Sequence, residues 1–262
     1  MPEGHTIHLL ARDHARALAG RPVGVSSPQG RFPDAAGIDG AVLEGTDAWG
    51  KHLFYELEGD RFVHVHLGIY GAFTEHAPPV PVPRPTCRMR LRGEAVVLDL
   101  IGPITCELLD RGGRDAVVAR LGPDPIRRDA DPERAWQALQ RRSTSIGQAL
   151  LDQRVVAGVG NVFRAEALFV HGIDPARPAR EVTRDEFDAL WATLVAMLRQ
   201  GVRDRRIITV DPAELGVARS RITKAEATHV YKRDACRRCG TPIRRWDLAG
   251  RWAYACPTCQ PV

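Results

Sequence analysis

The sequence predicts an α+β fold with a mostly β N-terminal half and a helical C-terminal half. Between Arg21 and about Gly122, short runs rich in Val, Phe and Tyr are punctuated by Gly and Pro, as in an antiparallel sandwich or barrel. After residues 121–125 the pattern changes, and apolar residues recur at helical spacing. A chain of 262 residues is long enough for two such domains.

The N-terminal half is expected to begin with a helix. Residues 4–18 place Ile7, Leu10 and Leu18 at roughly helical spacing, and Gly20 follows as a stop. Residues 77–85 contain five prolines and predict a loop. Strands are expected in the alternating runs 51–57, 62–66, 88–91 and 95–100.

Four segments of the C-terminal half carry helix signals. Asp131 followed by Pro132 is an N-cap with proline at the first helical position. Residues 145–153 and 161–171 predict two helices joined by a glycine-bearing turn. Thr183 and Glu186 form a capping box, and the helix that follows should run to about Gln200, before Gly201.

Charge is concentrated at one end of the chain. The net charge is +5, but residues 218–262 hold ten Lys or Arg against three acids, which is an electrostatic footprint for a polyphosphate. The alternative is a charged face kept for solubility. No apolar stretch reaches the roughly 18 residues of a membrane span, and the first residues lack the features of a secretory signal. We therefore expect a cytoplasmic protein without a membrane partner.

The last four of the six cysteines, Cys236, Cys239, Cys256 and Cys259, have the spacing C-x2-C-x16-C-x2-C. Two such knuckles bring four thiolates into a tetrahedron, so the spacing predicts one structural Zn²⁺, with disulfide pairing as the alternative. Cys87 and Cys106 lack partners at metal spacing and are expected to be small buried residues. Arginines and tryptophans interleaved in the finger favour nucleic-acid contact over a purely structural ribbon.

A second phosphate site is expected where Gly158 and Gly160 precede Asn161. Glycines let the backbone approach an anion, and a helix N-terminus directs N–H groups at it. The alternative is an ordinary glycine turn capped by Asn.

Four motifs in register carry a resemblance to a known family. They are Met1-Pro2-Glu3-Gly4, Gly50-Lys51-His52-Leu53, the stretch from Asp152-Gln153 through Val159-Gly160-Asn161-Val162, and the four-cysteine ribbon with Gly250-Arg251. Over its whole length the chain resembles the formamidopyrimidine-DNA glycosylase and endonuclease VIII (Fpg/Nei) family. The resemblance implies a helix and antiparallel β-sandwich domain, a helix-two-turn-helix domain and a β-hairpin zinc finger. The expected boundaries are 1–122, 123–217 and 218–262.

The N-terminus suits the chemistry that this resemblance implies. Removal of Met1 would free the secondary amine of Pro2, whose pKa of roughly 7.7 to 8 for a generic terminus leaves a reactive fraction. That amine can attack sugar C1′ and expel the base, leaving a Schiff base, while Glu3 moves protons. Alternatively, the two residues are only a processed terminus. The resemblance also assigns Lys51 to the site; otherwise it is a lysine solvating a turn.

The resemblance further implies how DNA is held. Arg251 would pinch the backbone with Asn161, and Ile69 and Tyr70 would fill the space left by a flipped nucleotide, unless they form a core strand. Thr6 replaces the family's usual second acid, which puts the lyase steps in question. Residues 99–103 lack the Arg and Phe with which Fpg proteins fill the gap opposite a lesion.

The resemblance thus implies a monomeric DNA glycosylase and AP lyase of base excision repair, bacterial in type and acting at the nucleoid. It would act on damaged DNA, excise oxidised bases, pyrimidines in preference, and cleave the strand by β,δ-elimination. The alternatives are 8-oxoguanine specificity of the Fpg type, a non-catalytic paralogue that binds damaged DNA, and a zinc-ribbon RNA-binding module.

Overall fold

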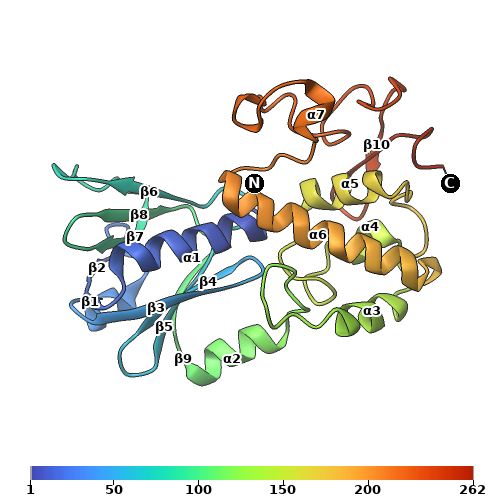
Figure 1. Ribbon diagram of the computed structural model, residues 1–262. Helices are drawn as coiled ribbons and strands as arrows, with labels where there is room; N and C mark the ends of the chain where they lie inside the picture. Colours follow the sequence, from blue (N-terminus) through green and yellow to red (C-terminus); the bar gives the residue numbers. More distant parts are fainter. Residues whose placement is uncertain (1, 262) are drawn as a thin grey trace. The chain divides into compact units, whose positions relative to one another are not determined.

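The computed structural model describes residues 2–261 (Figure 1), and the chain divides into two compact units with the boundary between Arg120 and Leu121. The first unit contains a long helix and two antiparallel sheets, and the second contains mostly helices and a small hairpin. The expected α+β class is confirmed. The three-part division with boundaries after residues 122 and 217 stays a prediction.

The first unit begins with helix α1 (Gly4–Leu18), as expected from the apolar spacing. One sheet has the strand order β1-β3-β4-β5-β9 and the other β2-β7-β8-β6. The strands are β1 (Arg21–Pro22), β2 (Gly24–Ser26), β3 (Val42–Trp49), β4 (His52–Leu57), β5 (Arg61–His66), β6 (Ala72–His76), β7 (Cys87–Arg92), β8 (Val97–Ile101) and β9 (Thr105–Asp110). A 3-10 turn covers Pro33–Gly37.

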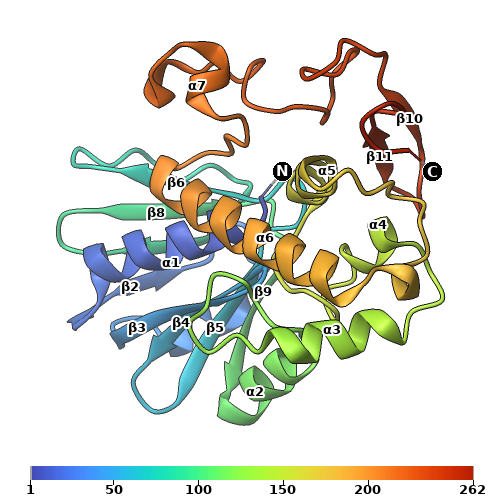
Figure 2. The ribbon, with the colours of Figure 1, turned by 45° about the vertical axis from the view of Figure 1, so that its right-hand side comes forward.

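A single apolar core joins α1 to both sheets. Ile7 and Leu18 of α1 lie in one buried cluster with Leu53 of β4 and Leu91 of β7. Both views draw α1 between the two sheets (Figures 1 and 2), and the Thr46 hydroxyl of β3 donates to the carbonyl of Ala11 at 2.6 Å. The alternation of strand side chains leaves His52, Phe54 and His64 on the opposite face of the five-stranded sheet.

The second unit confirms two of the predicted helix starts. Asp131 caps α3 by accepting from the Glu133 amide at 3.0 Å, and Thr183 with Glu186 forms the capping box of α6. The elements are α3 (Pro132–Gln140), α4 (Ile146–Ala149), α5 (Asn161–Val170), η2 (Ala179–Glu181), α6 (Arg184–Asp204), α7 (Pro212–Leu215), η3 (Arg219–Arg221), β10 (Arg244–Asp247) and β11 (Trp252–Ala255).

Three helical details differ from the sequence-based expectation. Helix α2 (Arg111–Ala119) lies in the segment expected to be mostly β, capped by Asp110, which accepts from the Gly113 amide at 2.7 Å. Helix α6 continues through Gly201, which is buried at the next step of the apolar spacing, and ends at Asp204, followed by Arg205 as its C-cap with φ of 59°. The helix expected over 145–153 is only the four residues of α4.

No helix among residues 2–261 is both long enough and apolar enough to span a membrane.

Candidate active site and metal centre

Pro2 and Glu3 lie at the start of α1. Pro2 is partly buried, whereas Glu3 is fully buried and supplies the N-cap, its carbonyl accepting from the Thr6 amide at 2.9 Å. The Thr6 hydroxyl lies 3.3 Å from Nε2 of His5. Burial lowers the pKa of His5 to about 4, so this imidazole is neutral at physiological pH. The hydroxyl at the position of the missing acid is therefore paired with a neutral group.

Lys51 lies at the same end of the first unit as Pro2. Gly20 donates to Leu43, so the start of β3 lies beside the end of α1, and Thr46 contacts Ala11 at mid-helix. Strand β3 and helix α1 therefore run in opposite directions. With a rise of about 3.3 Å per residue in the strand and about 1.5 Å per residue in the helix, β3 and α1 have similar lengths. The turn after β3, which carries Lys51, is thus brought to the start of α1.

The predicted void-filling residues lie in an exposed loop at this end. Strand β5 ends beside His52, and the following turn leaves Ile69 40% and Tyr70 87% exposed. The alternative of a core strand is therefore wrong. Ile104, from the β8–β9 connection, is 69% exposed and packs against Gly68, where an added Cβ would approach its side chain to 2.4 Å.

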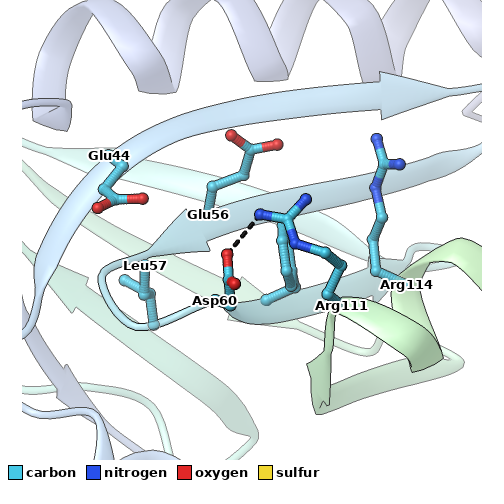
Figure 3. A pocket seen from close by; sticks show the side chains of 7 residues that line it. Glu44, Glu56, Leu57, Asp60, Arg111 and Arg114 are labelled. Carbon is cyan, nitrogen blue, oxygen red and sulfur yellow. Dashed lines mark hydrogen bonds and ion pairs between the residues drawn. The ribbon is translucent and has the colours of Figure 1, made fainter.

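A separate polar pocket of about 120 Å³ lies on the first unit (Figure 3). Arg111 reaches Asp60 there, and this ion pair lowers the pKa of the exposed Asp60 carboxyl. Glu44 and Glu56 line the same pocket. None of the site residues predicted from the sequence lines it, so it is distinct from the end of the unit that carries Pro2.

In the second unit, Asn161 follows a turn that is braced by one side chain. Gln153 donates to the carbonyl of Val159 at 3.0 Å and accepts from the amide of Gly158 at 2.9 Å. Gly158 has φ of 88°, which favours glycine. Asn161 is then the first residue of α5, 7% exposed, and its Oδ1 is buried without a hydrogen-bond partner among residues 2–261.

Arg251 belongs to a tight hairpin that is tied to α5. Ala249 and Gly250 both have positive φ, as a type I′ turn requires, and Arg251 is exposed. The carbonyl of the next residue, Trp252, accepts from Asn161 Nδ2 at 3.0 Å and from Arg164 at 2.7 Å. Asn161 and the Arg251 turn are therefore brought together.

The four cysteines of the C-terminal ribbon are positioned to bind a metal ion. Their Sγ atoms all lie within 4.8 Å of one another. Cys236 and Cys259 are 3.9 Å apart and Cys239 and Cys256 are 3.4 Å apart, which bracket the roughly 3.8 Å edge of a tetrahedron with 2.3 Å bonds. Hydrogen bonding by Thr241 lowers the pKa of Cys239 to about 6, which favours the ligating thiolate.

Basic side chains lie against aromatic rings on the β10–β11 hairpin. Arg244 lies 4.2 Å from the Trp246 ring centroid, and Arg245 lies 5.2 Å from that of Trp252, which is 52% exposed. Stacking holds these cations in place while leaving N–H donors for an anion.

Sequence reasoning gave no function to several residues that shape these sites. Arg164 and Glu166 are charged residues inside an otherwise apolar helix, and that pattern could have identified them as buried network members. His64 and Glu107 lie on different strands, so no local spacing connects them.

Fold and site together define a two-unit protein, with Pro2 and buried Glu3 at one end of a β-rich unit and four clustered cysteines, positioned to bind a metal ion, in a helical unit. Residues 1–100 match the N-terminal domain of formamidopyrimidine-DNA glycosylase, and residues 121–211 match its H2TH domain. "Endonuclease 8 1" of Mycobacterium tuberculosis is 50% identical over 99% of this chain and 100% of that protein.

More distant relatives extend the same match. The formamidopyrimidine-DNA glycosylase of Thermomicrobium roseum is 33% identical over 100% of both chains. The crystal structure of the Fpg protein from Thermus thermophilus is 28% identical with a TM-score of 0.80 over 99% of this chain and 98% of that one. A Lactococcus lactis Fpg complex shares the fold at 20% identity, with a TM-score of 0.81 and full coverage of both chains. The chain belongs to the Fpg/Nei family of DNA glycosylases with AP-lyase activity, on its endonuclease VIII-like branch.

Proposed function

We propose that the protein excises oxidised bases, pyrimidines in preference, from DNA through a Schiff base on Pro2. The observation that carries this proposal is the position of Pro2 and buried Glu3 at the start of α1, at the same end of the unit as Lys51. The positive end of the helix dipole disfavours a protonated amine beside it.

The proposed reaction uses the amine freed by removal of Met1. Pro2 nitrogen forms a bond to C1′ as the bond from C1′ to the base breaks, and the base leaves after taking up a proton. The C1′–O4′ bond then breaks as O4′ takes up a proton, which opens the sugar ring and leaves an iminium between Pro2 and C1′. Removal of a C2′ proton lets the iminium accept the electrons of that C–H bond, so the 3′ phosphate leaves, and removal of a C4′ proton then lets the 5′ phosphate leave (β,δ-elimination). Glu3 supplies and removes protons at the sugar, and Lys51 assists at the phosphate or the leaving base.

DNA is proposed to be held by Asn161 and Arg251, with Ile69 and Tyr70 filling the vacated space. Asn161 donates a hydrogen bond to the carbonyl of Trp252, the residue directly after Arg251. Ile69 and Tyr70 are exposed apolar side chains, of the kind that proteins insert between bases. The preference for pyrimidines rests on the similarity to proteins named endonuclease 8 and on residues 99–103, which lack the Arg and Phe of the Fpg type.

One structural Zn²⁺ is proposed for the four cysteines because four thiolates in a closed tetrahedron are its usual structural ligands. The ion would hold the hairpin that carries Arg251 and would take no part in bond cleavage. We further propose that the protein acts as a monomer in the cytoplasm, with damaged DNA as its partner.

Borohydride trapping of the untagged protein tests this function. Oligonucleotides carrying an abasic site, an oxidised pyrimidine or 8-oxoguanine are incubated with the wild type and with Pro2→Gly. A covalent adduct that depends on Pro2 is expected, strongest with the pyrimidine lesion among the two damaged bases.

A matched variant, Thr6→Glu, restores the acid found in relatives and checks whether Thr6 limits the lyase steps. If protein with Met1 verified absent forms no adduct on any substrate, the Schiff-base mechanism is wrong. Retained affinity for abasic DNA would then favour a non-catalytic damage-binding protein.

A further inference from the structure

Three side chains form a hydrogen-bonded chain across adjacent strands of the five-stranded sheet. Nδ1 of His52 on β4 lies 2.8 Å from Nε2 of His64 on β5. Nδ1 of His64 lies 2.9 Å from Oε1 of Glu107 on β9. The two imidazoles are also stacked, with ring centroids 5.1 Å apart. The chain therefore ends at His52, the residue directly after Lys51.

Both imidazoles of this chain are neutral at physiological pH. Burial lowers the pKa of His52 to about 3, helped by the neighbouring His64. Burial also lowers the pKa of His64 and outweighs the Glu107 carboxylate, which acts in the opposite direction. His64 is only 4% exposed.

The neutral imidazoles and the carboxylate together determine which ring nitrogen of His52 and of His64 carries the proton. An ionised carboxylate only accepts, so His64 carries its proton on Nδ1 and donates to Glu107. Nε2 of His64 is then an acceptor, and His52 must donate to it from Nδ1. The remaining nitrogen, Nε2 of His52, is left with a lone pair and no proton.

That lone pair is open to a donor. Among residues 2–261, the side chain of His52 forms a hydrogen bond only through Nδ1. Its Nε2 has no partner there, but it is not one of the buried polar atoms that lack a partner, so a donor can reach it. A nitrogen that only accepts cannot bind a phosphate oxygen, which also only accepts. It can bind an ammonium. The positive charges of Arg120 and Lys51 both depress the pKa of His52, and Lys51, the residue directly before His52, also depresses that of His66.

We propose that Glu107 and His64 lock His52 in one tautomer, and that His52 is a positioning residue which accepts a hydrogen bond from the Lys51 ammonium during the reaction. This inference rests on the proposed function only for the role of Lys51. The ammonium has three protons on a flexible stem, so one fixed acceptor narrows the directions in which the other two can point.

Two substitutions of His52 separate this role from a structural one. The carboxamide of His52→Gln reaches the place of Nε2 and keeps an acceptor there. The carboxamide of His52→Asn reaches only the place of Nδ1. We expect His52→Gln to keep the wild-type rate of adduct formation on abasic DNA, and His52→Asn to lose about tenfold at saturating DNA. The affinity for DNA should be the same in both variants, because no phosphate contact is removed.

Nitrogen-15 NMR of the imidazoles provides a test that does not depend on activity. The expected result at pH 7.5 is a proton on Nδ1 of both His52 and His64, and Glu107→Ala should release His52 to a mixture of tautomers. A proton on Nε2 of His52 in the wild type would overturn the proposal.

The outcomes distinguish the two proposals. Equal rates for the Gln and Asn variants, in proteins with the wild-type melting temperature, would refute the positioning role while leaving the Schiff base intact. If the wild type forms no adduct at all, the proposed function fails, and the NMR measurement still decides whether the chain fixes the tautomer.

Discussion

Among the described residues, Arg164 has the largest of the fully buried side chains. Its side chain is fully buried in α5, and its guanidinium donates to the carbonyls of Trp252 at 2.7 Å and Gly147 at 3.3 Å. A charged group this deep is tolerated only when it is hydrogen-bonded. Arg164 therefore ties the Arg251 hairpin to α5 and to the segment of α4.

Replacement of Arg164 by Met should lower the free energy of unfolding by about 2 to 3 kcal/mol, because hydrogen bonds from a charged donor are lost inside the protein. DNA affinity should also fall, since the Trp252 carbonyl then keeps only Asn161 as a partner. Urea unfolding and fluorescence anisotropy measure the two effects. Arg245→Met is the matched control: it removes an exposed arginine and should lower affinity with little change in stability. Equal stability of both variants would contradict the assigned role.

Other residues of the site could be predicted more readily from the sequence. The spacing of the four cysteines correctly predicted that they lie together, positioned to bind a metal ion, because each pair is close in sequence. The hydrogen bond between Asn161 and the residue after Arg251 joins positions 91 residues apart. Only the family resemblance predicted that pairing, because no spacing rule connects side chains on separate elements.

At the scale of elements, caps and apolar spacing predicted helices well where the helix is regular. Helix α4 stops early because the Asp152 carbonyl accepts from the Val155 and Val156 amides and turns the chain. The apolar residues there are buried in the turn, so their spacing resembled a helix. Helix α2 was missed because Gly112 and Gly113 occupy its first turn and only Val117 is buried.

The packing of α1 and β4 makes the first unit sensitive to acid. Burial lowers the pKa of His5 and His14 to about 4 and that of His52 to about 3. The unfolded chain takes up these protons near pH 6.5, whereas the folded one does so only below about pH 4. Stability is therefore complete above pH 6.5 and is lost as the pH falls toward the folded values.

Each of these histidines should cost about 1.4 kcal/mol of stability by about pH 5.5. Urea unfolding at pH 7.5, 6.5 and 5.5 measures the slope. His52→Gln should reduce the uptake of protons on unfolding by nearly one, whereas the control His8→Gln should leave the three buried groups and their contribution unchanged. An unfolding free energy that is flat from pH 7.5 to 5.5 would show that these groups titrate normally.

At the scale of the whole molecule, charge and metal ligands are concentrated in the same C-terminal stretch. Residues 218–262 have an excess of seven positive charges, more than the whole chain's +5, so the remaining residues are slightly acidic. The cysteines that hold this stretch in shape are far from Pro2 in sequence, and the residues of the first unit form their own core. Metal binding and the integrity of the N-terminal unit should therefore be separable.

Removal of the metal by a chelator should abolish tight DNA binding while leaving most of the secondary structure intact. The reason is that four thiolates without a cation repel one another, so the hairpin that carries Arg251 loses its fixed shape. Metal analysis should find one zinc per chain in the wild type and none in Cys239→Ser, whereas Cys87→Ala, which changes a buried cysteine outside the cluster, should retain one.

The Arg251→Ala variant should keep the metal but bind DNA more weakly, and the slope of log affinity against log salt should fall by about one. If the chelated protein bound abasic DNA with wild-type affinity and the same salt slope, the basic ribbon could not be the element that grips the DNA backbone, and the contacts would have to come from Lys51 and Asn161.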